Sequence, residues 1–91
     1  MIYFGMKQIK WDIEKNVWLK GTRGVSFDEL VNSRFISIEK HPTRKHQNIM
    51  LFEFNNYVWA VPYVREKEYL FFKTAFPSRK YTKKYLRGDE L

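Results

Sequence analysis

The feature that most constrains the fold of this chain is a change in the spacing of its apolar residues at Arg34. Before this residue, apolar side chains recur at helical intervals, and after it they recur at every second position, which is typical of strands. Four strand-like segments follow, at residues 35–40, 49–54, 57–64 and 68–75. The turns between the last three are short, so we predict a four-stranded antiparallel sheet in meander order.

Two details of these strands carry predictions of their own. Asn55 and Asn56 are expected to form a two-residue hairpin turn, because asparagine tolerates a positive φ. Pro62 cannot donate to a ladder, so we expect a bulge there that bends the sheet. The strand around Pro62 is apolar on both faces. One face can pack on helices, and the other must meet a partner, another helix or a ligand.

A short strand and a first helix are predicted near the N-terminus. Residues 7–11 are strand-like, and Asp12 is a suitable N-cap for a helix that extends to about residue 20. Ile13 and Val17 stand four positions apart, so we expect them on the inner face of this helix.

A second, shorter helix is predicted to begin at Ser26. Ser26 and Glu29 have the spacing of a capping box, in which each side chain accepts a hydrogen bond from the backbone N–H of the other. Its apolar residues are expected to face inward: Phe27, Leu30 and Val31.

The length of the chain predicts one domain over residues 1–91. A domain of this size has little core, but 19% of its residues are aromatic, and each ring can bury about 150–250 Å². We therefore expect Trp11, Trp18 and Trp59 to serve packing. With the elements above, the fold class is α+β, with the strand and two helices at the N-terminus, the sheet, and a C-terminal helix.

Positive charge is concentrated in two parts of the chain. Lys and Arg number 17 against 10 Asp and Glu, a formal net charge of +7, and the excess falls in residues 43–46 and 79–87. This balance points to an acidic partner, such as nucleic acid, an anionic membrane or an acidic protein. The alternative is that the charge serves only solubility.

The later basic segment is predicted to be a short helix. Ser78 is its expected N-cap, which leaves backbone N–H groups free for a phosphate. Tyr81 and Tyr85 lie on the side that can rest on the sheet. The cations cover another side: Arg79, Lys80, Lys83, Lys84 and Arg87. We hypothesise that the sheet presents this side to RNA.

The earlier basic segment is a loop that also contains two histidines. Histidine can transfer protons near neutrality, and Arg and Lys stabilise the phosphorane formed when a 2′-hydroxyl attacks an RNA phosphodiester. If the loop and the helix meet, the expected catalytic residues are His41, His46, Arg79 and Lys80. The expected RNA-binding residues are then Arg44, Lys45, Lys83, Lys84, Tyr81 and Tyr85. The sequence leaves open whether the two segments lie at the same end of the sheet.

Each of these roles has a plainer alternative. His41 with Pro42 also suits a turn of the chain, the loop cations suit a solvated surface, and the two helix tyrosines suit core contacts. A tyrosine or lysine replaces histidine as the base if a neighbouring cation lowers its pKa. Two histidines without cysteine or clustered carboxylates do not indicate a metal site, so we expect no metal and no cofactor.

The ends of the chain suggest no targeting signal. The opening apolar run is too short for a signal peptide or a membrane span. Residues 88–91, G-D-E-L, resemble an endoplasmic-reticulum retention tail but lack the Lys or His of its first position. We interpret the tail as coincidence and expect a cytoplasmic protein that does not contact membranes.

Three segments together resemble BrnT-type toxins of type II toxin–antitoxin systems, which are relatives of the RelE ribonuclease fold. They read W-D-I-E-K-N at residues 11–16, R-G-V-S-F-D-E-L at 23–30 and P-S-R-K-Y-T-K-K-Y at 77–85, and they span most of the chain. The resemblance implies a RelE-like fold and a ribonuclease that arrests growth by cutting RNA. From this resemblance we assign functional roles only to Arg79 and Lys80. Two other segments, the H-P-T-R-K-H-Q-N loop and the V-P-Y-V strand, differ from those of the best-known members of the family.

The resemblance also implies a cognate antitoxin. This partner would cover the basic face in a hetero-oligomer such as a 2:2 complex, and DNA would be contacted only through the antitoxin. The leading hypothesis is therefore a toxin that cleaves RNA without a metal. The alternatives are a non-catalytic nucleic-acid-binding module and a protein-interaction domain whose cations pair with an acidic partner.

Overall fold

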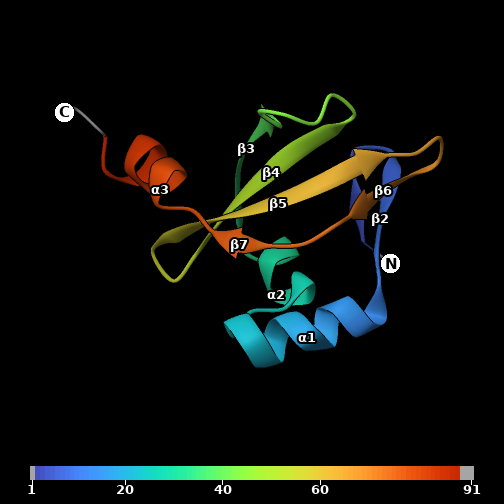
Figure 1. The fold of residues 1–91 in the computed structure, drawn as a ribbon, viewed down its shortest axis with the longest axis horizontal. Helices are drawn as coiled ribbons and strands as arrows, with labels where there is room; N and C mark the ends of the chain where they lie inside the picture. The colour runs from blue at the N-terminus through green and yellow to red at the C-terminus, as the bar shows by residue number, and fades with distance from the viewer. Residues whose placement is uncertain (1, 89–91) are drawn as a thin grey trace.

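Residues 2–88 are described by a computed structural model, in which three helices pack against a curled mixed sheet (Figure 1). The fold is α+β, as predicted. Its elements in chain order are β1 (Tyr3–Phe4), β2 (Lys7–Trp11), α1 (Ile13–Arg23), α2 (Phe27–Val31), β3 (Arg34–Lys40), β4 (Gln47–Phe54), β5 (Tyr57–Arg65), β6 (Tyr69–Phe72), β7 (Phe76–Pro77) and α3 (Arg79–Leu86).

The sheet contains the predicted meander but is larger than predicted. Its strand order is β1-β2-β6-β5-β4-β3, and β7 pairs with β5 beyond the end of β6. The four expected strands are antiparallel neighbours, and Asn55 and Asn56 have the positive φ values of their predicted turn, 53° and 63°. However, β2 joins the sheet parallel to β6, with Ile9 opposite Leu70. A four-stranded, purely antiparallel sheet is therefore not confirmed, because pairing between strands so far apart in the chain leaves no local signal.

Pro62 is accommodated by its neighbouring strand and not by a bulge in its own. The pairing of β4 with β5 continues without a shift through Ile49 and Pro62, so no bulge lies on that side of β5. On the other side, three residues, 73–75, stand opposite Val61 and Pro62, so the irregularity predicted at Pro62 lies in the neighbouring strand. The Pro62 carbonyl accepts a hydrogen bond from the Lys73 N–H at 2.8 Å, between the end of β6 and the start of β7. The missing N–H of Pro62 faces the same side, since the N–H and C=O of a strand residue point the same way. The break between β6 and β7 thus lies opposite Pro62, where β5 has no backbone N–H to donate.

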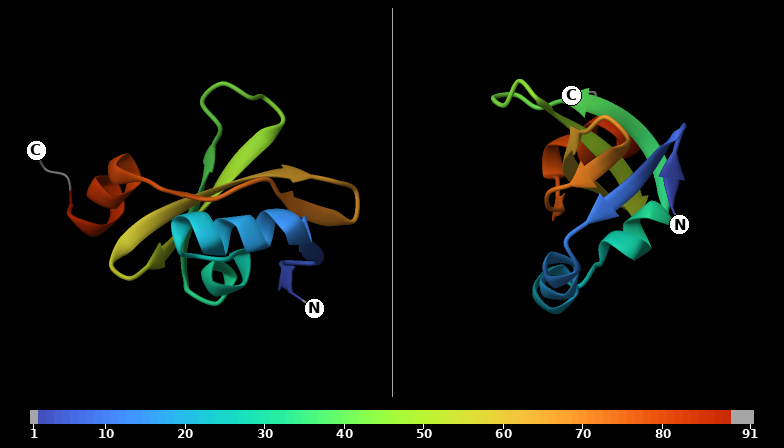
Figure 2. Two further views of the ribbon diagram at one scale, coloured as in Figure 1. Left: turned by 60° about the horizontal axis from the view of Figure 1, so that its bottom comes forward. Right: turned by 90° about the vertical axis from the view of Figure 1, so that its right-hand side faces the viewer.

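The curl of the sheet brings its two ends together. Phe4 of β1 and Phe35 of β3 end the strand order, yet their ring centroids lie 5.1 Å apart. Inside the curl, one face of the sheet packs against α1 and α2 (Figure 2). The fully buried residues of this inner core include Leu19, Phe27, Leu30, Met50, Val61 and Phe72.

The third helix, α3, covers the outer face of the sheet. The apolar side chains there form a second core of Ile49, Leu51, Val58, Ala60 and Tyr81. Tyr81 comes from α3, and Tyr85 and Leu86 of the same helix pack against this cluster. Of the three possible covers, the structure shows another helix.

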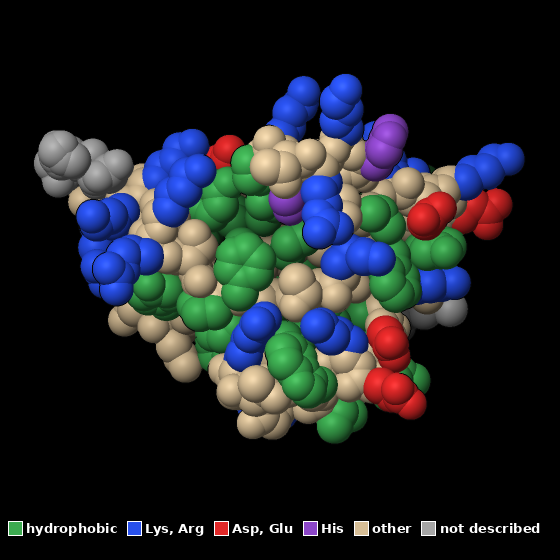
Figure 3. Space-filling model, in the orientation of Figure 1, with side chains coloured by type: hydrophobic (Ala, Val, Ile, Leu, Met, Phe, Trp, Pro, Cys, Tyr) green, Lys and Arg blue, Asp and Glu red, His purple; other side chains and the backbone are tan. Residues whose placement is uncertain are grey.

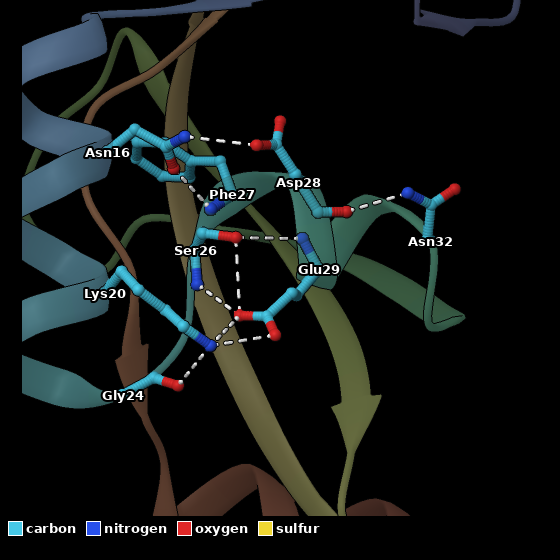
Figure 4. Close-up of polar contacts among 8 residues, drawn as sticks. All are labelled: Asn16, Lys20, Gly24, Ser26, Phe27, Asp28, Glu29 and Asn32. Carbon is cyan, nitrogen blue, oxygen red and sulfur yellow. Dashed lines mark hydrogen bonds and ion pairs between the residues drawn. The ribbon is translucent and has the colours of Figure 1, made fainter.

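The orientation of α1 differs from the prediction. Ile13 and Val17 are 76% and 68% exposed, and Leu19 is the one fully buried side chain of this helix. The face of α1 that turns toward α2 makes polar contacts with it (Figure 4). The Asn16 Oδ1 atom accepts a hydrogen bond from the Phe27 N–H at 2.7 Å, and the Lys20 Nζ atom lies 3.0 Å from the Glu29 carboxylate.

The predicted start of α2 is confirmed. The Ser26 hydroxyl accepts from the Glu29 N–H at 3.2 Å, and the Glu29 carboxylate accepts from the Ser26 N–H at 2.9 Å. The hydrogen bond that the Glu29 carboxylate accepts from the Ser26 N–H, followed by that from Lys20, lowers the pKa of Glu29. Within residues 2–88, no helix is long and apolar enough to cross a membrane. The last three residues of the G-D-E-L tail lie outside the described residues.

Candidate nucleic-acid interface

Helix α3 is fixed to Val58 of β5 by the buried Thr82 hydroxyl and by the Ser78 N–H, which donates to the Val58 carbonyl at 2.9 Å. Ser78 is the N-cap, as predicted, and its hydroxyl accepts a hydrogen bond from the Tyr81 N–H at 3.1 Å. The Thr82 hydroxyl accepts from the Val58 N–H at 2.9 Å and donates to the Ser78 carbonyl at 2.7 Å. These bonds tie one end of the helix to the sheet, so its side chains are held in a defined orientation.

The two tyrosines of α3 face the sheet and not the solvent. Tyr81 is 8% exposed and Tyr85 is half-buried, with their ring centroids 6.4 Å apart. Burial, followed by the charge of Glu39, raises the pKa of Tyr81. Both rings therefore serve as core contacts, the plainer of the two roles that the sequence left open.

The basic side chains of α3 form one exposed surface. We call this the α3 surface, and it consists of Arg79, Lys80, Lys83, Lys84 and Arg87, all of them exposed. Among the described carboxylates, only Glu39 forms an ion pair with it, through Lys84 at 3.1 Å. Figure 3 shows these cations at the left of the molecule, and a second group along the top, over the connection between β3 and β4.

Glu39 is the point where α3 meets β3. The Tyr85 hydroxyl and the Lys84 Nζ atom both donate to its Oε2 atom. The Tyr85 hydrogen bond, and then that of Lys84, lowers the pKa of Glu39, and the carboxylate in turn raises the pKa of Lys84. Neither Lys84 nor Tyr81 is therefore shifted toward neutrality, so the structure does not support either as the base.

His41 holds the loop after β3 in its turn. Its Nδ1 atom accepts hydrogen bonds from the N–H groups of Thr43 and Arg44, at 3.2 and 3.1 Å. This assigns the neutral tautomer that carries its proton on Nε2. The structure thus shows the turn-forming role for His41, and leaves its Nε2–H free to donate to an anion.

The loop encloses a cavity lined by hydrogen-bond donors. This loop cavity has a volume of about 370 Å³. Its lining residues are Lys40, His41, Arg44, Lys45, Gln47 and Asn48. None of these six side chains is a carboxylate, and three are cations. Such a set of donors suits a phosphate group, because each donor can meet one of its oxygens.

The predicted catalytic residues do not form one pocket. No residue of α3 lines the loop cavity, so Arg79 and Lys80 are separated from His41. His46 is exposed. Glu39 contacts α3, and Lys40, the next residue of β3, lines the cavity, but successive residues of a strand point to opposite faces of the sheet, so this adjacency does not join the two regions. Both groups of cations are visible from one side of the molecule (Figure 3).

Sequence reasoning missed Lys40, Glu39 and Thr82. Lys40 and Glu39 end a strand, and nothing in their spacing shows which side chains α3 brings to them. For Thr82 there was a signal, since a hydroxyl four positions after an N-cap serine is placed to bond its carbonyl. Within residues 2–88, no group of three or more His, Cys, Asp or Glu side chains is placed to hold a metal ion.

The first two segments that carry the family resemblance meet in space. Trp11 of the first and Phe27 of the second have ring centroids 5.4 Å apart, and Asn16 contacts both Phe27 and Asp28 (Figure 4). These residues join α1 to α2, and none of them lines the loop cavity or belongs to the α3 surface. No protein family, curated protein or solved structure matches this chain.

Proposed function

We propose that this protein is the toxin of a type II toxin–antitoxin pair, with a RelE-like fold, that binds and cleaves cytoplasmic RNA without a metal. The observation that carries the proposal is that both basic regions, the α3 surface and the cations of the loop, lie on one side of the molecule (Figure 3). A phosphodiester backbone bears one charge per nucleotide, and a row of exposed cations neutralises several of these charges at once.

The loop cavity is the proposed site of the scissile phosphate. Its cations stabilise the charge of the phosphorane, where one well-placed donor is worth about 3–4 kcal/mol. The 2′-hydroxyl loses a proton and attacks phosphorus, the bond to the 5′-oxygen breaks, and the leaving oxygen takes up a proton. His41 donates its Nε2–H to a phosphate oxygen, and the exposed His46 is available for proton transfer.

The α3 surface holds the RNA beside this site in the proposal. Arg79 and Lys80 then act in binding, because they do not line the loop cavity. The antitoxin is the proposed partner that covers this basic side in a hetero-oligomer and inhibits the toxin. Any contact with DNA is made by the antitoxin.

The test measures RNA decay in EDTA and RNA affinity as a function of salt. Replacing Arg44 and Lys45 by Gln should lower kcat by about 100-fold or more, since these cations are expected to act in the transition state. Replacing Arg79 and Lys80 by Gln should raise KM and lower the slope of log affinity against log salt by about 1.4. Lys10→Gln, which changes an exposed cation on β2, is the matched control.

Two results would contradict this assignment. Cleavage that requires a divalent metal would disprove the metal-free mechanism. A loss of kcat only in the Arg79 and Lys80 variant would place the scissile phosphate on the α3 surface instead of in the loop cavity.

A non-catalytic RNA-binding module is the second candidate. It is favoured by the separation of the two basic regions and by the raised pKa values of Tyr81 and Lys84, which do not suit a base. This candidate predicts the same salt dependence with no RNA product.

A further inference from the structure

Trp18 is an exposed aromatic side chain that the proposed function does not use. It is 43% exposed on α1, although the sequence suggested a packing role. Two cations lie over its ring: the Lys15 Nζ atom is 4.3 Å and the Arg23 guanidinium carbon 5.0 Å from the ring centroid. Surfaces that bind single-stranded nucleic acid combine exposed aromatic rings with cations.

Arg23 connects Trp18 to a hollow at the end of α1. Its Nη1 atom donates to the Ala75 carbonyl at 2.6 Å, which holds the guanidinium against the segment between β6 and β7. Arg23 also lines a hollow of about 390 Å³. We call this the aromatic hollow, and its lining includes Arg23, Phe54, Asn55, Tyr57, Trp59 and Pro77.

The chemistry of the aromatic hollow suits a nucleobase. The half-buried Phe54 and Tyr57 provide aromatic surface, to which the buried Trp59 adds little, while Arg23 and Asn55 provide hydrogen-bond donors. Its volume lies in the range of small-ligand sites, about 300–1,000 Å³. Its lining residues include no carboxylate, so nothing there repels a phosphate that follows the base.

The aromatic hollow also adjoins the α3 surface. Pro77 lines the hollow and directly precedes Ser78, the N-cap of α3. A strand of RNA on Arg79 therefore has a short path along the chain to the hollow. Trp18 and Arg23 continue that path onto α1.

We infer that the aromatic hollow and Trp18 bind unpaired bases of single-stranded RNA that is held on the α3 surface. This inference rests on the proposed function and deepens it, because it makes the preferred substrate single-stranded. A paired base cannot enter the hollow, since both of its faces are stacked within the duplex. The Tyr57 ring contributes a stacking surface. The Lys15 and Arg23 cations lie over the Trp18 ring, so a base stacks on the indole by displacing Lys15, while Arg23 binds the intervening phosphate.

The experiment compares two probes, a short 2′-O-methylated single strand that resists cleavage and a duplex of the same sequence. Affinities are measured by fluorescence anisotropy for Trp18→Ala, Tyr57→Ala and Arg23→Gln. We expect each variant to bind the single strand about 5- to 150-fold more weakly, with duplex binding unchanged. The matched control is Tyr69→Ala, since Tyr69 is a half-buried aromatic on β6 with the Lys10 Nζ atom 4.5 Å from its ring centroid.

Trp18→Ala keeps the test valid if Tyr57→Ala fails to fold, because Trp18 is exposed and a circular dichroism melt will show an intact fold. If Trp18→Ala and Arg23→Gln bind the single strand as tightly as the parent, while loss of Arg79 and Lys80 weakens binding, the inference is overturned and the proposed function stands. If Trp18→Ala changes only the oligomeric state in sedimentation, the surface is a protein interface and the inference is likewise overturned. If the parent protein binds neither probe, the proposed function itself fails.

Discussion

Helices α1 and α3 are both basic and both amphipathic, yet they are attached to the sheet in different ways. Helix α3 buries Tyr81 and Thr82 and exposes its cations. Helix α1 buries only Leu19, and leaves Ile13 and Val17 in solvent. The polar contacts of Asn16, Lys20 and Arg23 do much of its positioning, with the neighbouring α2 and the Ala75 carbonyl as partners.

The difference shows that an apolar pair at helical spacing does not by itself decide which face a helix buries. On α3, the spacing of tyrosines and cations agreed with the hydroxyl contacts of Ser78 and Thr82, so all of them pointed to one orientation. On α1, the buried Leu19 and the bond from Asn16 to the start of α2 outweighed the pair formed by Ile13 and Val17. The following predictions test this contrast, beginning with the largest expected effect.

Leu19→Ala should be the most damaging change to α1. Leu19 is 0% exposed, and removing its side chain leaves a cavity in the inner core. We expect the free energy of unfolding to fall by about 2–5 kcal/mol, measured by urea denaturation. If Leu19→Ala lowers the free energy of unfolding no more than the substitution of an exposed residue does, α1 is held by its polar contacts alone.

Thr82→Val should have the next largest effect and should act on α3. The substitution keeps the shape of the side chain but leaves the Val58 N–H without its partner, and it removes the bond to the Ser78 carbonyl. The expected loss is about 1–3 kcal/mol in the free energy of unfolding. Thr82→Ser retains the hydroxyl and should lose less, so equal losses in both variants would contradict the role given to the hydrogen bonds.

Glu39→Gln should make a smaller, pH-dependent difference. The folded-state pKa of Glu39 lies below its ordinary value of 4.5, so the carboxylate stabilises the folded protein above pH 4.5. This stabilisation is lost as the pH falls through the folded-state pKa. We expect Glu39→Gln to lower the free energy of unfolding by about 0.5–1 kcal/mol at neutral pH.

The measurement compares urea denaturation of Glu39→Gln and the parent at neutral and acidic pH. The difference between the two proteins should shrink as the pH is lowered below 4.5. A difference that stays constant with pH would show that the ionised carboxylate is not what joins α3 to β3.

Replacing Ile13 and Val17 by Ser should have the smallest effect. Both side chains are exposed, and surface substitutions usually change stability by less than about 0.5 kcal/mol. Thermal denaturation should show little change. A loss comparable to that of Leu19→Ala would restore the inward orientation that the sequence first suggested.

Much of the local structure was predictable because its signals lie within a few residues. The capping box of Ser26 and Glu29, the Asn55–Asn56 turn and the span of β2 are each determined by neighbours in the chain. The basic side of α3 was predictable for the same reason. The position of the loop relative to α3 was not predictable, because it depends on which strands α3 packs against. The contact of Lys84 with Glu39 of β3 is visible only in the tertiary structure.

The amino-acid sequence alone therefore determined the class of the fold, most element boundaries, the N-caps of α2 and α3 and the excess of positive charge. The tertiary structure decided the parallel pairing of β2 with β6, the gap opposite Pro62, the inward face of α1 and the separation of Arg79 from His41. The physical reason is range. Caps, turns and periodicity act over a few residues, whereas strand order and the meeting of side chains from distant segments follow from the packing of the whole chain.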